Sequence, residues 1–140
     1  MPEENCKICK VEDSSPYVVY QTSFWRIRHI DETDIAGYCL LESKRHILDL
    51  STARDEELEQ YGVILSKLMA AQRKLIPSCE RIYTYSLAEA VPHFHVHVIP
   101  RRADFPAEYK GRGIMAYPLS PVLELDRVSE VVKDLQRLLV

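Results

Sequence analysis

The sequence contains no apolar run that approaches the roughly 20 residues of a membrane-spanning helix, so we expect no contact with a membrane. Its first four residues are polar and acidic, unlike a secretory signal peptide, which favours a cytoplasmic protein. Cysteine occurs four times, and only Cys6 and Cys9 are close together, which is unlike the disulfide framework of a small secreted domain. Basic residues are not in excess, because 18 Lys and Arg accompany 21 Asp and Glu. The net charge of -3 does not predict a basic surface for binding a long nucleic acid, and it favours a small-molecule partner.

The length of 140 residues suits one core, and we predict a single domain over residues 1–140. Aromatic and β-branched segments predict strands, whereas apolar residues spaced by three or four predict helices. Ser51 and Thr52 offer caps to the first helix, and Pro77 ends it. The arrangement predicts an α+β fold, a mainly antiparallel five-stranded sheet with one long helix packed on it and a C-terminal helix. The predicted strands are residues 17–20, 24–30, 38–41, 81–87 and 93–99, the helices are 55–76 and 125–139, and residues 101–124 are expected to be irregular.

Three of the five histidines alternate with apolar residues in one predicted strand, at His93, His95 and His97. Alternate residues of a strand share a face, so all three imidazoles are predicted to face the same way, close enough to approach one phosphate group. A half-exposed strand whose polar residues happen to be histidine is the simplest alternative. A zinc enzyme using two or three of these imidazoles is another, although no His-Glu-x-x-His helix accompanies them.

The nine residues from His93 to Arg101 resemble the signature of the histidine-triad (HIT) superfamily, in which three histidines alternate with hydrophobic residues and Pro-Arg often follows. The resemblance extends over residues 6–101, and nothing is carried over to the C-terminal extension, residues 102–140. It implies a homodimer with nucleotide pockets and a two-step reaction through a nucleotidyl-histidine. His95 corresponds to the nucleophile, the carbonyl of His93 holds its ring, and His97 contacts the phosphate or leaving group. No catalytic metal is implied. A neutral imidazole is a good nucleophile near pH 7, which agrees with this scheme.

Two positions concern substrate binding. The family presents an acidic residue to the ribose from this part of the chain, where the alignment fits either His29 or Asp31. We assign Asp31 to the site and leave His29 outside it, since such a histidine is more often a surface residue. Glu89 stands where the family has a neutral Gln near the substrate, and a carboxylate beside a phosphate is repulsive unless it is protonated or turned away. A second departure is Tyr38, which follows Gly37 where many members have His.

The N-terminal Cys6 and Cys9 have the spacing of half a zinc site, although such a pair is a weak signal by itself. Some HIT proteins are similar in this region and hold a structural zinc with residues that match Cys6, Cys9, His46 and His93. Such a site would tie the N-terminal segment to two strands and contribute to folding. The alternative is two idle thiols, with His46 capping a strand end.

The leading hypothesis for function is a nucleotide hydrolase or transferase that cleaves a phosphoanhydride, phosphoester or phosphoramidate. One alternative is a nucleotidylyltransferase that passes the group to an acceptor other than water. Another is a non-catalytic nucleotide-binding protein that keeps the pocket but has lost turnover through Glu89 and Ala90.

Overall fold

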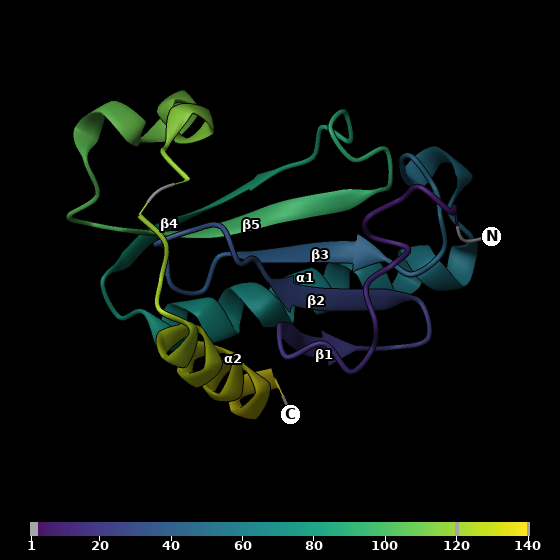
Figure 1. Ribbon diagram of the computed structural model, residues 1–140, viewed down its shortest axis with the longest axis horizontal. Coiled ribbons are helices and arrows are strands. Elements are labelled where there is room, and N and C mark those ends of the chain that lie inside the picture. Colours follow the sequence, from purple (N-terminus) through teal and green to yellow (C-terminus); the bar gives the residue numbers. More distant parts are fainter. Residues whose placement is uncertain (1–2, 120, 140) are drawn as a thin grey trace.

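A computed structural model describes residues 3–119 and 121–139 of the chain. Five strands form one antiparallel sheet in the order β1-β2-β3-β5-β4 (Figure 1). This arrangement confirms the predicted α+β fold. The strands are β1 (Val18–Gln21), β2 (Trp25–His29), β3 (Cys39–Ser43), β4 (Cys79–Tyr85) and β5 (His95–Arg102).

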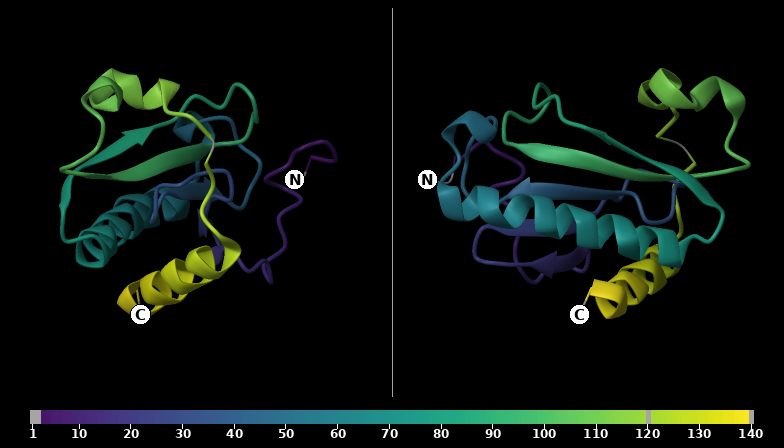
Figure 2. Two further views of the ribbon diagram at one scale, coloured as in Figure 1. Left: turned by 60° about the vertical axis from the view of Figure 1, so that its left-hand side comes forward. Right: turned by 180° about the vertical axis from the view of Figure 1, so that it is seen from behind.

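Two long helices form the layer behind the sheet. Helix α1 (Asp55–Leu75) runs along one face of the sheet, and α2 (Leu125–Leu139) packs against α1 and β1 (Figure 2). The largest side chains of the core between these layers are fully buried, and the indole Nε1 of Trp25 donates to the Glu57 carbonyl at 2.9 Å, joining β2 to α1. Burial of apolar side chains in this layer stabilises the fold, by about 25 cal/mol per Å² of area removed from water.

The ends of the helices agree closely with the sequence patterns. Helix α2 has the predicted bounds, and α1 begins at Asp55 but ends at Leu75, one residue early. The predicted caps are wrong, because Ser51 and Thr52 belong to a short 3-10 helix, η1 (Leu50–Thr52). The residue preceding α1 is Arg54, whose amide donates to the Glu57 carboxylate at 2.7 Å. An acidic side chain in the first turn thus satisfies an amide at the helix start.

Strand β5 is displaced from its predicted bounds at both ends. It begins at His95 rather than His93, and it continues through Pro100 to Arg102. Strand β3 pairs with β5 only as far as Val98, whereas β4 pairs with it through Arg102. Pro100 therefore lies where β5 has one neighbour, and a missing N–H is tolerated there.

The segment after β5 is more ordered than the sequence predicted. It contains η2 (Ala107–Tyr109) and η3 (Gly111–Ala116), and a Cβ at Gly113 would overlap the Glu108 carbonyl. Ile114 of η3 and Phe105 are buried in a second, smaller apolar cluster on the face of the sheet away from α1. Within residues 3–119 and 121–139, no helix has the length and apolar character needed to cross a membrane.

Candidate functional site

The face of the sheet away from α1 carries the polar residues. Ile27, Leu41 and Val96 belong to the core beneath α1, so alternation turns their neighbours toward the opposite face. A cavity of about 650 Å³ opens there, which is within the usual size of a small-molecule site. Its lining joins β2, β3 and β5 to the loop before β5 and to the C-terminal extension, and includes Arg28, Asp31, Tyr38, Leu40, Tyr85, Leu87, Glu89, His95, His97, Met115 and Leu119.

His95 is the first residue of β5, and hydrogen bonds hold both its backbone and its ring. The Ser86 hydroxyl donates to its carbonyl at 2.7 Å, and its ring Nδ1 lies 2.7 Å from the His93 carbonyl. A carbonyl only accepts, so Nδ1 carries the proton and Nε2 keeps a free lone pair. His95 is 8% exposed and lines the cavity.

His97 follows on the same face and is held by two tyrosines. Its Nδ1 lies 2.6 Å from the Tyr38 hydroxyl, and its ring stacks on Tyr85 with centroids 4.3 Å apart. Burial lowers the pKa of His97 to about 4, with repulsion from His95 as a smaller cause. His97 is therefore neutral near pH 7.

The prediction that all three imidazoles face one way is wrong for His93. This residue precedes β5, is fully buried, and does not line the cavity. Strand alternation does not apply before the strand begins, and the backbone instead turns the ring toward the N-terminal segment. Its carbonyl still reaches the His95 ring.

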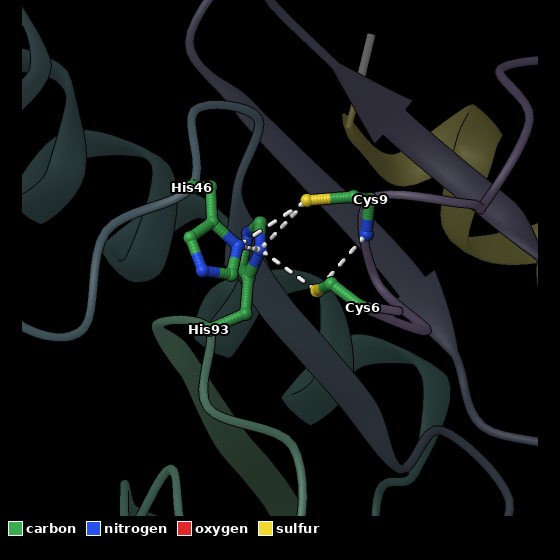
Figure 3. A group of neighbouring side chains, drawn as sticks. All are labelled: Cys6, Cys9, His46 and His93. Atoms are coloured by element: carbon green, nitrogen blue, oxygen red, sulfur yellow. Dashed lines mark hydrogen bonds between the residues drawn. The ribbon is translucent and has the colours of Figure 1, made fainter. Parts of the chain in front are cut away.

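The His93 ring belongs to a cluster with Cys6, Cys9 and His46, the four residues that the resemblance implied for zinc (Figure 3). Their donor atoms lie within 4.8 Å of one another. The Nδ1 of His93 is 3.4 Å from the Cys6 sulfur and 3.2 Å from the Nδ1 of His46, and Cys9 Sγ is 3.3 Å from that same His46 nitrogen. Tetrahedral zinc with ordinary Zn–N and Zn–S bonds requires separations of roughly 3.3 to 3.8 Å. The cluster is near this size.

The surroundings of His93 also suit a metal ligand. Its Nε2 lies 2.6 Å from the Ser43 carbonyl, so Nε2 carries the proton and Nδ1 presents a lone pair to the sulfurs. Burial lowers the pKa of His93, which keeps the ring neutral. Two thiols and two imidazole nitrogens converging on one point fit a structural zinc, and zinc would tie the N-terminal segment to β3 and the start of β5.

Asp31 and Glu89, the two predicted substrate-binding residues, both line the cavity. Asp31 follows β2, and Glu89 lies in the loop before β5, where Ala88 has a positive φ of 53°. Glu89 is exposed, so its charge is screened by water. His29, which the sequence analysis left outside the site, is buried in the fold and does not line the cavity.

Arg28 of β2 is a cavity residue that the sequence analysis missed. Its guanidinium makes two hydrogen bonds of 3.1 Å to the buried Glu42 carboxylate, which also accepts one of 2.7 Å from Arg26. Two positive charges therefore surround one negative charge beneath the cavity. The alternation of Arg26 and Arg28 could have predicted that both side chains share a face, the one that Leu40 and His97 occupy, but not their contact with Glu42 of β3.

Residues 12–104 match the HIT domain. Among solved structures, similarity extends to a Zn-bound histidine triad family protein from Mycobacterium smegmatis (20% identity, TM-score 0.71, 96% of this chain and 93% of that chain). It also extends to a hypothetical histidine triad nucleotide-binding protein from Sulfolobus tokodaii (16%, 0.72, 96% and 91%) and to the diadenosine triphosphate hydrolase of Plasmodium falciparum (16%, 0.64, 91% and 79%). No curated protein matches the sequence. With a family match that covers well over half of its length, the chain belongs to the HIT domain family.

Proposed function

We propose that this HIT protein is a nucleotide hydrolase or transferase in which His95 attacks the α-phosphorus of a phosphoanhydride, phosphoester or phosphoramidate. The observation that carries the proposal is the 2.7 Å contact between His95 Nδ1 and the His93 carbonyl. It places the lone pair of Nε2 on a ring that lines a cavity of nucleotide size. Family membership and the diadenosine triphosphate hydrolase among its structural neighbours support the same reaction class.

The chemistry proceeds in two displacements. In the first, the Nε2 lone pair forms an N–P bond while the bond from phosphorus to the leaving group breaks, and the leaving group departs with that electron pair and takes up a proton. In the second, water or another acceptor forms an O–P bond while the N–P bond breaks and its electron pair returns to Nε2. The acceptor loses its proton to solvent, and His95 is released as neutral imidazole. No step requires a metal, which leaves the zinc cluster a structural role.

The rest of the cavity suits the parts of a nucleotide. Asp31 offers a carboxylate to ribose hydroxyls, and Leu40, Met115 and Leu119 give apolar surface for a base. Met115 and Leu119 come from the C-terminal extension, so this part of the chain shapes the pocket. The extension is therefore the proposed source of base preference.

Arg28 is the proposed cation for the phosphate. Two of its five N–H groups bond to Glu42, and the other three have no hydrogen-bond partner within residues 3–119 and 121–139. Glu42 holds the guanidinium in place, and Arg26 supplies a second positive charge to the cluster. The exposed Asp13 carboxylate lies farther out, 3.8 Å from Arg26 and 3.9 Å from Lys44. A fixed guanidinium is well suited to bind phosphate oxygens.

Replacing Arg28 with glutamine should weaken AMP binding by roughly ten- to a hundredfold, the effect of one charge-assisted hydrogen bond of about 1.5 to 3 kcal/mol. Isothermal titration measures the affinity. Arg127→Gln on exposed α2 removes the same charge far from the cavity and serves as the control. Equal affinities for the two variants, each folded by circular dichroism, would remove Arg28 from the site.

Replacing Glu89 with glutamine should tighten ATP binding by more than about threefold at low ionic strength, because a carboxylate repels the phosphates across a partly screened gap. Glu59→Gln is the matched control, since Glu59 is exposed on α1, on the other side of the sheet. If both variants bind ATP as the wild type does, Glu89 has no contact with substrate.

The proposed activity is tested by incubating the zinc-bound protein with adenosine and guanosine polyphosphates and phosphoramidates and measuring nucleoside monophosphate release. Turnover of at least one substrate is expected. Tight binding without any product would instead favour the non-catalytic nucleotide-binding protein, for which Glu89 in the cavity is the specific argument. Product that appears only with an added hydroxyl or phosphate acceptor would favour the transferase.

A further inference from the structure

Tyr38 is held unusually firmly for a residue that lines a cavity. It is 8% exposed and lies in the smaller apolar cluster with Ile99 and Ile114. Its backbone follows Gly37, which has a φ of 85°, a conformation that favours glycine. The amide of Gly37 donates to His29 Nε2 at 3.0 Å, which is the structural role of that buried histidine. The Tyr38 hydroxyl is thereby fixed in space.

The Tyr38 hydroxyl has two neighbours at different distances. His97 Nδ1 lies at 2.6 Å and the Tyr85 hydroxyl at 3.3 Å. A phenol has one proton, and the shorter contact is the stronger bond. Imidazole nitrogen is a better acceptor than a phenol oxygen, whose lone pair is delocalised into the ring. The proton of Tyr38 therefore lies toward His97, and burial raises the pKa of Tyr38, so that proton is retained.

The ring of His97 cannot turn away from this contact. The Tyr85 ring stacks on it with an interplanar angle of 11°. The Tyr38 ring packs against it in an edge-to-face arrangement, with an interplanar angle of 69°. With Nδ1 occupied by the hydroxyl, the one proton of the neutral ring is on Nε2, the nitrogen directed away from Tyr38. His95, 5.2 Å away by ring centroids, has the opposite arrangement, with its proton on Nδ1.

We infer that Tyr38 is a positioning residue that holds His97 as the neutral Nε2–H tautomer, so that the cavity receives a lone pair from His95 and a hydrogen-bond donor from His97. This inference rests on the proposed function. His97 then donates to a phosphate oxygen or to the leaving-group oxygen as negative charge develops there. His95 is the nucleophile because a carbonyl accepts the proton of its Nδ1. His97 is the donor because the Tyr38 hydroxyl donates to its Nδ1.

Nitrogen NMR of the zinc-bound protein tests the tautomer directly, because protonated and unprotonated ring nitrogens have well-separated ¹⁵N shifts. In the wild type, His97 is expected to have an unprotonated Nδ1 and a protonated Nε2 at pH 7. In Tyr38→Phe, which keeps the ring and removes the hydroxyl, the two shifts should move toward each other, and kcat should fall roughly tenfold with a smaller change in KM. Tyr61→Phe removes a phenol hydroxyl from α1, on the other side of the sheet, and should retain wild-type shifts and kcat.

A protonated Nδ1 on His97 in the wild type would overturn the inference, even if Tyr38→Phe failed to fold. Tyr38→Phe shifts identical to wild type, or a kcat within about twofold of it, would overturn it as well. If no substrate is turned over by any form, the proposed function fails, while the ¹⁵N shifts of wild type and Tyr38→Phe still decide how His97 is held.

Discussion

Replacing His95 with alanine should reduce turnover by at least about a thousandfold, the scale on which enzymes depend on their nucleophile. Nucleotide binding should change little, because Arg28, Asp31 and the apolar walls of the cavity remain. The fold should persist as well, since the ring lies on the cavity face of β5 rather than in the core beneath α1. Steady-state kinetics and AMP titration on the same preparation separate these effects.

The size of the loss distinguishes a nucleophile from a neighbour of the phosphate. Removing a single hydrogen-bond donor to a charged group costs roughly 1.5 to 3 kcal/mol, or about ten- to a hundredfold. His97→Ala, on the adjacent position of the same face, is the matched comparison and should show a loss in that smaller range. Turnover of His95→Ala within about tenfold of wild type would contradict the covalent mechanism.

Removing the metal should destabilise the protein more than any change in the cavity. Protein purified without chelator is expected to contain one zinc per chain, held by Cys6, Cys9, His46 and His93. Chelation or Cys6→Ser should lower Tm by roughly 10 °C or more, because binding energy at a structural zinc site is folding energy. Turnover of the folded fraction should change less, since the zinc lies outside the cavity and acts on His95 only through the His93 backbone.

Cys79→Ser is the control for this prediction. Cys79 lies on β4, outside the cluster, and within the described ranges its thiol makes one hydrogen bond, to the Arg81 carbonyl. Its substitution should preserve zinc content and Tm. Protein that contains no zinc, or a Cys6→Ser form with unchanged zinc content and Tm, would mean that the four residues are idle thiols and imidazoles.

Regular local patterns were sufficient to predict most of the fold. The three-and-four spacing of apolar residues located both helices to within one residue. Alternation placed His95 and His97 on one face, because within a strand the backbone determines side-chain direction. Strand ends were less accurate, since they depend on neighbours that local sequence does not specify. The last strand was expected to end at residue 99, yet Pro100 lies within β5, where β4 alone pairs with it.

Sequence patterns predicted the site residues that belong to a local motif. They did not predict contacts between segments that are distant in the sequence. The alternation rule was extended two residues too far, to His93, whose ring turns toward Cys6 and Cys9 because Ser43 holds its Nε2. The Arg28 cluster was missed because its counter-charge, Glu42, comes from another strand. The apolar wall formed by the C-terminal extension was missed too, because no local periodicity in its Pro- and Gly-rich sequence indicates a packed segment.

The stereochemical course at phosphorus tests the central claim most directly. A substrate turned over by the protein is prepared with a chiral thiophosphate at the α-position, and the configuration of the product formed in ¹⁸O-water is determined. Each in-line displacement inverts phosphorus, so attack by His95 followed by attack by water predicts overall retention. Net inversion would show that water attacks the substrate directly and would contradict a nucleotidyl-histidine on His95.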